Sequence, residues 1–242
     1  MEKTVSEAIQ YRRSVRVYTD EKIETSKVKQ CLRNASLAPT SSNLQLWEFY
    51  HLTDKSILEK MKPLCLGQNA ANTAQQLVVV VTRKDLWPQR AKANKDFVRE
   101  TYHQENLSER DQKRKKMALD YYGKLIPTLY ADFLGILGWI KYAIFQVVGL
   151  FQPTYRQSRL SDMRIVAHKS AGLAAQNFMI SMAAIGYDTC PMEGTDTLRV
   201  KTLLKLPRGA EINMVISCGI RDEKGIYGPR FRVPFQEVYF EV

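Results

Sequence analysis

The sequence has few of the residues that build metal sites or covalent catalytic sites. It contains four cysteines and three histidines, with neither a C-x-x-C pair nor an H-x-x-x-H pair. This scarcity excludes a zinc knuckle and a thioredoxin-type motif, and we expect neither a metal site nor a histidine-based triad. Cys31 and Cys218 lie in apolar runs and are expected to be buried packing residues.

Glycine and proline are also scarce. Twelve glycines and nine prolines in 242 residues are too few for a linker-rich chain. Hydrophobic residues make up 45% and charged residues 25%, which are ordinary values for a globular protein and exclude wholesale disorder. The opening stretch MEKTVSEAIQYRRS has no apolar core of signal-peptide length, so we expect a cytoplasmic protein.

Acidic residues are outnumbered. Thirty-six Lys and Arg against twenty-five Asp and Glu give a formal net charge of +11. Such an excess of positive charge is compatible with binding to a phosphate-bearing cofactor, to nucleic acid or to an anionic lipid surface, and it does not distinguish between these partners. Residues 83–116 hold eleven basic and six acidic residues and are interpreted most simply as a solvated pair of charged helices.

Several segments predict secondary structure from their pattern. The β-branched run 77–82 is typical of a strand buried on both faces, and 212–219 predicts a second buried strand. Residues 47–52 alternate like a strand, 27–37 form an amphipathic helix, and 165–184 form a long apolar helix. The class is therefore α+β or mixed α/β.

Two further segments are apolar. In the tail 234–242, alternating side chains end at Val242 and predict a terminal strand that could pair with another subunit. Residues 133–155 contain a single charge, Lys141, and are long enough to span a membrane. A central Lys costs about 2.5–3.5 kcal/mol on insertion, and glycines and a proline weaken the helix. A lid or subunit-packing helix is therefore favoured, with peripheral membrane contact left open.

Basic side chains gather in two short segments. Residues 12–16 read RRSVR, and in an extended chain Arg12, Ser14 and Arg16 point to one side. Guanidinium and hydroxyl donors suit a phosphate and a carbonyl-rich ring edge, which makes Arg12, Arg13, Ser14 and Arg16 candidate ligand contacts. Arg230 and Arg232 share a face in the same way and make a second phosphate clamp.

Two polar turns are further candidates. The first is rich in hydrogen-bond donors and consists of Pro39, Thr40, Ser41, Ser42 and Asn43. The second follows the long helix and contains Pro191, Met192, Glu193 and Gly194. We expect Pro191 and Gly194 to break regular strand pairing, which would leave backbone N–H groups around Glu193 free to face a ligand.

Taken together, these segments resemble the nitroreductase family of FMN-dependent NAD(P)H oxidoreductases. The family pattern is an early R-x-S-x-R/K, a P-S/T-S-x-N-x-Q-x-W segment, a P-x-E-G after the core helix and a basic pair before a terminal strand. All four motifs occur here in order, from Arg12 to Pro234. The resemblance covers about residues 5–82 and 165–242.

The resemblance implies a fold and an assembly. It implies an α+β protein with a central, mainly antiparallel sheet flanked by helices, and an intertwined homodimer. The chain would be one domain, 1–242, with a lid or insertion at about 84–164. Because lids of this family vary most, this insertion would decide which acceptor is reduced.

The resemblance also implies how FMN would be held. Arg12, Ser14 and Arg16 would hold the phosphate, ribityl chain and pyrimidine edge, and Arg230 and Arg232 the phosphate. Residues 191–194 would lie along the isoalloxazine ring, with the Glu193 backbone N–H, rather than its carboxylate, aimed at flavin N5. Residues 41–43 would reach the flavin from the partner subunit. The complete implied set is Arg12, Arg13, Ser14, Arg16, Pro39, Thr40, Ser41, Ser42, Asn43, Gln68, Asn69, Pro191, Met192, Glu193, Gly194, Arg230 and Arg232. Gln68 or Asn69 would replace an amide usual in the family, whose accompanying Lys is missing.

The implied reaction moves electrons from NADH or NADPH through FMN to a nitroaromatic, quinone or similar small planar acceptor by a ping-pong mechanism. A specialised flavoenzyme of the same fold, a reductive dehalogenase or flavin-modifying enzyme, is the alternative. A dehalogenase acting on an amino acid would need a set such as Glu105, Tyr121 and Lys124.

The substrate pocket could be lined by aromatic residues, namely Tyr121, Tyr122, Trp139 and Tyr142, although aromatic core packing is the simpler interpretation. A basic module for nucleic acid or membrane is a weaker alternative, and no nucleic-acid partner is expected.

Overall fold

A single antiparallel sheet lies at the centre of the molecule. The structure is a computed structural model that describes residues 2–133 and 135–242. Within this described part, the strand order is β1-β2-β4-β3 and every neighbouring pair is antiparallel. The strands are β1 (Trp47–Leu52), β2 (Gln76–Thr82), β3 (Asp188–Met192) and β4 (Glu211–Gly219). The predicted α+β class and mainly antiparallel sheet are confirmed.

Strand β2 divides the core into two layers. It lies between β1 and β4, and all seven of its residues are buried. Because side chains alternate along a strand, Val78 and Val80 join one hydrophobic cluster, whereas Val79 and Val81 join another on the opposite face. The prediction of a strand buried on both faces is therefore correct.

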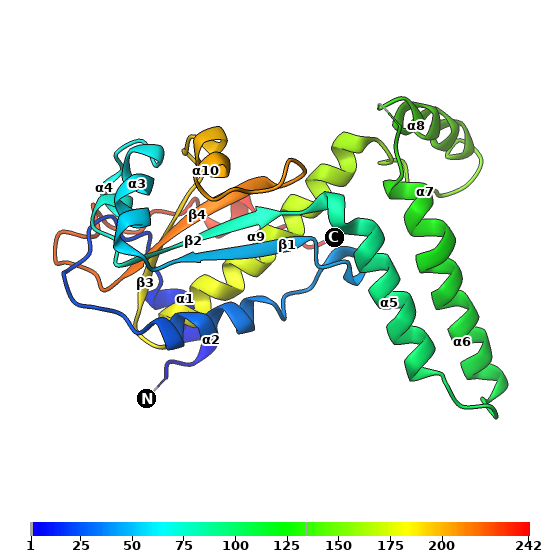
Figure 1. Cartoon of the computed structure of the whole chain (residues 1–242), viewed down its shortest axis with the longest axis horizontal. Coiled ribbons are helices and arrows are strands. Elements are labelled where there is room, and N and C mark those ends of the chain that lie inside the picture. Colours follow the sequence, from blue (N-terminus) through cyan, green and yellow to red (C-terminus); the bar gives the residue numbers. More distant parts are fainter. Residues whose placement is uncertain (1, 134) are drawn as a thin grey trace.

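Helices cover both faces of the sheet (Figure 1). The long helix α9 (Leu160–Ala184) lies on one face, where Ala171, Ala174 and Ala175 allow close packing. On the same side are α1 (Val5–Tyr11) and α2 (Thr25–Ala35). The other face carries α3 (Lys55–Leu64), α4 (Asn69–Asn72) and α10 (Thr197–Leu203). Helix α9 begins five residues before the predicted start because Asp162 accepts a hydrogen bond from the Arg159 backbone N–H and caps the first turn.

The segment between β2 and α9 projects from one end of the sheet (Figure 1). It starts with the 3-10 turn η2 (Lys84–Leu86) and the expected charged pair α5 (Trp87–Thr101) and α6 (Glu109–Asp120). A π-helical turn, η3 (Tyr121–Leu125), leads into α7 (Ile126–Tyr130) and α8 (Ile136–Val148). None of the described helices combines the length and apolar character needed to cross a membrane.

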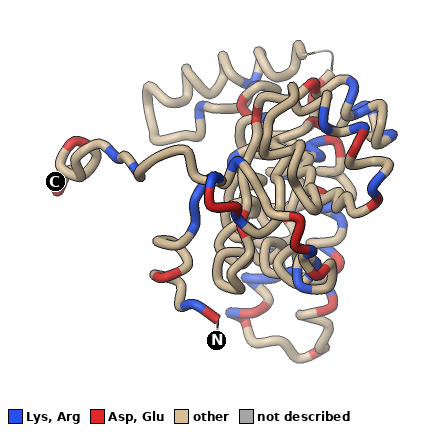
Figure 2. The backbone as a smooth tube through the Cα atoms, turned by 90° about the vertical axis from the view of Figure 1, so that its left-hand side faces the viewer, with Lys and Arg blue, Asp and Glu red and all other residues tan. Residues whose placement is uncertain are grey.

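The expected terminal strand is not formed. Residues 234–242 contain only the short 3-10 helix η4 (Phe235–Glu237), and every residue from 227 to 242 is exposed. A strand needs a neighbour for its backbone hydrogen bonds, and this tail leaves the body of the chain (Figure 2). The alternating apolar side chains therefore form no strand within one chain, and pairing of this tail with another subunit stays a prediction.

The four cysteines are buried and unpaired, as expected for Cys31 and Cys218. Burial raises the pKa of the Cys31 and Cys65 thiols to about 11. Burial also raises the pKa of Cys190 and Cys218. Thiols with raised pKa values are poor nucleophiles, so their role is packing.

Candidate functional site

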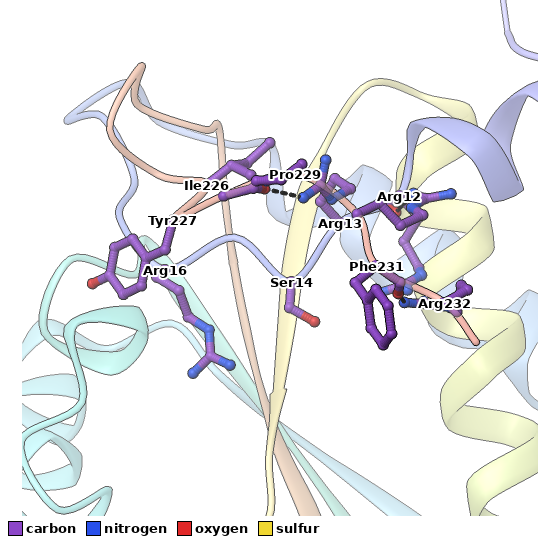
Figure 3. A pocket seen from close by; sticks show the side chains of 11 residues that line it. Arg12, Arg13, Ser14, Arg16, Ile226, Tyr227, Pro229, Phe231 and Arg232 are labelled. Atoms are coloured by element: carbon purple, nitrogen blue, oxygen red, sulfur yellow. Dashed lines mark hydrogen bonds between the residues drawn. The ribbon is translucent and has the colours of Figure 1, made fainter. Parts of the chain in front are cut away.

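Residues from both ends of the chain line one cavity of about 280 Å³, which we call the arginine cavity (Figure 3). One wall is the segment 12–16 after α1, and the other is the segment 226–232 after β4. All six predicted contacts in these segments line it: Arg12, Arg13, Ser14, Arg16, Arg230 and Arg232. The structure adds Ile226, Tyr227, Gly228, Pro229 and Phe231.

The first wall is fixed by the end of α1 and by the edge of the sheet. A capping box between Thr4 and Glu7 starts the helix, and the chain then becomes extended after Arg12. The backbone N–H of Val15 donates to the Thr189 carbonyl of β3 at 3.2 Å. Because Val15 is fully buried, its neighbours Ser14 and Arg16 point the other way, toward the cavity.

Hydrogen bonds from arginines tie the second wall to the first. Arg13 Nη2 donates to the Gly228 carbonyl at 2.6 Å (Figure 3). Arg230 Nη2 donates to the carbonyls of Gln10 at 2.8 Å and Arg12 at 2.5 Å. The last helical turn of α1 therefore fixes where the C-terminal segment crosses it. The backbone N–H of Arg16 also donates to the Gly225 carbonyl, at 2.7 Å.

The arginine cavity carries positive charge without compensation. It is lined by five guanidinium groups and by no Asp or Glu. Within residues 2–133 and 135–242, none of these five groups forms an ion pair with a carboxylate. Burial lowers the pKa of Arg12, and the charges of Arg230 and Arg232 lower it further. An anion with several acceptor oxygens, such as a phosphate, would relieve this repulsion.

Gln68 and Asn69 connect the arginine cavity to the turn after β3. Gln68 Nε2 donates to the Gly194 carbonyl at 2.8 Å, and Asn69 Nδ2 donates to the Tyr227 hydroxyl at 2.9 Å. These two residues begin α4, so one short helix holds the 193–194 turn and a wall of the cavity. The structure thus brings four of the predicted segments together.

The structure corrects one expectation about the 191–194 segment. Pro191 does not break strand pairing, because β3 runs from Asp188 to Met192 and Pro191 stands opposite Ile216 of β4. β3 is an edge strand, and the carbonyl of Thr189 faces away from β4 and accepts from Val15. Pro191 lies two residues further and faces the same way, so the N–H group that it lacks is not needed for pairing with β4. Regular pairing ends after Met192. No described residue accepts a hydrogen bond from the backbone N–H groups of Glu193 and Gly194.

The 39–43 segment contacts the projecting helices instead. It contains the 3-10 turn η1 (Ser41–Asn43), whose Ser42 has a φ of 54° and Asn43 a φ of 51°. Such left-handed values are unfavourable for a residue with a side chain and occur where neighbours enforce them. Here the Ser42 hydroxyl lies 2.7 Å from the Tyr121 hydroxyl, and Asn43 Nδ2 donates to Asn94 Oδ1 at 2.9 Å. Thr40 Oγ1 accepts from the Gln45 backbone N–H at 3.2 Å.

Ser41 and Ser42 line a second cavity of about 350 Å³, which we call the tyrosine cavity. Its other walls are Tyr121, Leu125, Leu129, Tyr130, Phe145, Thr154, Tyr155, Met163 and Val166. No residue lines both cavities. Within one chain, the 39–43 segment is therefore not brought to the arginines, and Pro39 and Asn43 line neither cavity. A contribution from a partner subunit stays a prediction.

The aromatic candidates of the projecting segment separate into two groups. Tyr121 lines the tyrosine cavity, whereas Trp139 and Tyr142 lie outside it in an edge-on pair. Core packing is the wrong interpretation for Trp139, which is 62% exposed. The structure does not unite the dehalogenase set either. Glu105 lines a separate cavity beside α6, and Lys124 pairs with Asp120 at 2.7 Å.

Sequence reasoning missed several lining residues. Tyr227 and Phe231 interleave with the predicted arginines, and the signal for them was their position between Gly225 and Arg232. Tyr130, Phe145 and Tyr155 line the tyrosine cavity but belong to a segment whose fold the sequence did not reveal. Within the described residues, no three His, Cys, Asp or Glu side chains are grouped so that they could hold a metal ion.

The chain is similar in sequence and in fold to proteins of one family. The model of the nitroreductase family matches residues 9–220. The chain is 28% identical over 218 residues to protein DrgA of Synechocystis sp., covering 90% of this chain and 84% of that protein. It is 28% identical over 217 residues to a protein of Staphylococcus haemolyticus named as an NAD(P)H nitroreductase, covering 89% and 83%. A structure from Exiguobacterium sibiricum, described as a nitroreductase in complex with FMN, aligns with a TM-score of 0.70 and 21% identity, covering 99% and 98% of the two chains.

Proposed function

The chain belongs to the nitroreductase family, and we propose that it is an FMN-dependent oxidoreductase that transfers electrons from NADH or NADPH to a nitroaromatic, quinone or similar planar acceptor. The observation that carries this proposal is the arginine cavity, with five guanidinium groups and no carboxylate. The names of the relative from S. haemolyticus and of the FMN complex from E. sibiricum support the same conclusion. We place the activity in the cytoplasm.

The side chains of the arginine cavity fit the phosphate end of FMN. Arg12 and Arg16 line it from one wall and Arg232 from the other, and guanidinium groups bind phosphate oxygens through paired hydrogen bonds. Ser14 adds a hydroxyl for the sugar-like ribityl chain. Arg13 and Arg230 each donate to a backbone carbonyl of the opposite wall, so their role is to hold the two walls together. Arg232, in contrast, donates within its own wall, to the carbonyl of Phe231. The charge and donor set of the cavity therefore suit a phosphorylated cofactor.

The turn after β3 supplies donors for the ring end. When bound, FMN supplies the two-electron chemistry, and the protein supplies position and electrostatics. The backbone N–H groups of Glu193 and Gly194 make no hydrogen bond with described residues, and Gln68 fixes the turn by donating to the Gly194 carbonyl. Fixed N–H donors stabilise negative charge that develops nearby, which is the role we assign to the Glu193 backbone. The Glu193 carboxylate is exposed and has no part in this role.

We further propose that the protein is a homodimer in which each chain completes the other's site. The tail from 227 to 242 is exposed throughout and includes apolar side chains such as Phe231 and Phe240. The tail extends away from the body of the chain (Figure 2). Exposed apolar side chains of this kind are commonly buried against another chain, and a second copy of this protein would provide that surface. The partner's Ser41–Asn43 turn would then meet the cofactor, which it does not reach within one chain.

The tyrosine cavity is our candidate for the acceptor. Aromatic and aliphatic walls suit a planar molecule, and the hydroxyls of Ser41, Ser42 and Tyr130 provide a few polar contacts. Burial raises the pKa of Tyr130 to about 12, so its hydroxyl remains a neutral donor at physiological pH. The alternative dehalogenase function has no support in this geometry, because Glu105 and Tyr121 line different cavities and Lys124 pairs with Asp120.

The first experiment is the visible absorption spectrum of the purified protein, followed by identification of the cofactor that heating releases. We expect flavin bands and about one FMN per chain, together with oxidation of NADH or NADPH when a quinone or nitroaromatic is added. Replacing both Arg12→Ala and Arg232→Ala should remove most of the bound FMN. Each charge-assisted hydrogen bond contributes about 1.5–3 kcal/mol, or roughly 10- to 100-fold in affinity.

The control is Arg199→Ala, which removes an exposed arginine of α10 that pairs with Asp196. This variant should keep its full FMN content. A colourless wild-type protein that also fails to take up added FMN would refute the oxidoreductase proposal. Unchanged FMN content in the double variant would instead refute the arginine cavity as the phosphate site.

A further inference from the structure

Helix α8 turns its apolar side chains away from the protein. The exposed residues of the helix and the turn that follows it are all apolar: Ile136, Leu137, Trp139, Ile140, Ala143, Ile144, Val147, Leu150 and Phe151. At 100° per residue these positions form one continuous face. A helix on a water-facing surface normally shows the opposite pattern, with its polar side outward. We call this surface the outer face of α8.

The lysine of α8 points inward instead. Lys141 Nζ donates to the carbonyls of Thr128 at 2.9 Å, Leu129 at 3.2 Å and Ala131 at 2.6 Å. These carbonyls end α7, so a lysine caps the preceding helix from beneath α8. Gln146 lies at the flank of the helix, where its Oε1 accepts from the exposed Arg156 at 2.9 Å. The orientation of α8 is therefore fixed by specific contacts, and its outer face is a property of the fold.

Arginines lie beside the outer face, and one of them is paired with a carboxylate. Residues 133–161 contain Lys141, Arg156 and Arg159 and no Asp or Glu, but Asp162 pairs with Arg159 at 3.1 Å. The guanidinium of Arg159 lies 5.4 Å from the ring centre of Trp139 and 4.8 Å from that of Tyr142. Arg156 Nη2 donates to the Gly149 carbonyl at the end of the helix. Both arginines thus lie along one flank of α8.

We propose that α8 lies in the plane of an anionic membrane surface, with its outer face in the acyl boundary and Arg156 among the lipid headgroups. The helix has 13 residues, too few to cross a bilayer, so it would lie flat. Tryptophan, tyrosine and arginine beside an apolar face are the residues typical of the membrane interface. An interfacial helix usually has a polar face on its own surface, and here the body of the protein behind α8 serves in place of that polar face.

A lipid surface explains the outer face better than a second protein chain does. Protein interfaces carry about one hydrogen bond per 100–200 Å² and include polar side chains at their edges. The outer face offers no hydrogen-bonding side chain except the Trp139 indole at its flank. In both views α8 also lies at the upper limit of the molecule, where a flat surface can reach it (Figures 1 and 2). The formal net charge of +11 favours an anionic surface over a neutral one.

The test is sedimentation of the full-length protein with vesicles. We expect the wild type to pellet with phosphatidylcholine vesicles that contain phosphatidylglycerol, and several-fold less with phosphatidylcholine alone. The double variant I140E/I144E should stay in the supernatant, with at least a tenfold loss of partitioning. The emission of the exposed Trp139 should shift to shorter wavelength with anionic vesicles, and W139F should lose that shift.

The matched control is F97E/L198E, which places glutamates at two apolar positions, 67% and 74% exposed, on α5 and α10. It should pellet like the wild type. Far-ultraviolet circular dichroism and FMN content report whether each variant is folded, and I140S/I144S repeats the test without added charge. The proposal is overturned if the wild type fails to pellet, if I140E/I144E still pellets, or if that variant instead loses an oligomer on sedimentation velocity. The last result would assign the outer face to contacts between copies.

Discussion

The buried carboxylate of Asp188 holds Arg221 at the corner where β3, β4 and α1 meet. Its Oδ2 accepts from the Arg221 backbone N–H at 2.9 Å, and its Oδ1 accepts from Arg221 Nε at 2.9 Å. The Asp188 side chain is 1% exposed, and the guanidinium lies 4.0 Å from the ring centre of Tyr11. Since Tyr11 directly precedes Arg12, this ion pair supports one wall of the arginine cavity.

Replacing Asp188→Asn should destabilise the protein by about 2–4 kcal/mol, because it leaves a partly buried guanidinium without its counter-charge. Urea unfolding would measure the loss. Asp96→Asn is the comparison, since Asp96 forms exposed pairs with Lys92 and Arg99 on α5 and should cost less than about 1 kcal/mol. Equal losses in the two variants would contradict the structural role of Asp188.

A methyl group at Gly219 has no room. A Cβ there would lie 2.7 Å from the ring of Tyr18, whose hydroxyl is held 2.8 Å from the Ser217 hydroxyl. Gly219→Ala should therefore cost about 1–3 kcal/mol in the free energy of unfolding. At Gly123 the nearest atom to a Cβ would be the flexible end of Lys95, at 3.5 Å. Gly123→Ala should be neutral or stabilise by about 0.5–1 kcal/mol, and thermal unfolding of both variants checks the pair.

His51 should make stability depend on pH. Its Nε2 lies 2.7 Å from Gln76 Oε1, and Gln76 Nε2 donates to the Ile23 carbonyl, so His51 is the donor. Burial lowers the pKa of His51 below its ordinary 6.5. The unfolded chain then binds the proton more readily, so stability is full above about pH 6.5 and falls as pH drops through the folded pKa. His51→Gln should flatten unfolding midpoints between about pH 7.5 and about pH 5.5. An identical slope in wild type and variant would contradict this assignment.

Ending the chain after Val233 tests the role of the tail. The removed residues are all exposed and form only the short helix η4. The truncated chain should fold with nearly unchanged secondary structure, yet sediment as a monomer and lose most of its FMN. Analytical ultracentrifugation and the flavin absorbance together measure both effects. A truncated protein that remains dimeric would contradict the proposed contact of the tail with a second chain.

Elements buried on several sides could be predicted from the sequence. The run 77–82 has no polar face, and 165–184 has small residues throughout, so each pattern has one structural solution. It is harder to predict from the sequence whether a strand lies at the edge of the sheet. Pro191 was expected to end pairing, but the outer side of an edge strand needs no N–H from it.

The direction in which a helix turns its side chains could not be predicted from the sequence either. Hydropathy identified an apolar helix near Lys141 but could not show that the lysine faces inward, because this depends on where α7 ends. The convergence of Arg12 and Arg232 was implied by the family resemblance, in which both would contact the phosphate, and the structure brings them to one cavity. Motif spacing did not predict the tyrosine cavity, whose walls come from six separate segments of the chain.

The strand order β1-β2-β4-β3 has a consequence for how the chain is made. Gln76 pairs with Cys218 and Thr82 with Glu211, so β2 gains its second neighbour only after residues 83–210 have been translated. At roughly 5–20 residues per second this takes on the order of ten seconds. During that interval a valine-rich edge is open, which is the kind of segment that recruits other nascent chains into aggregates. We therefore expect soluble yield to respond to expression temperature and chaperone supply more than to the stability of the finished fold.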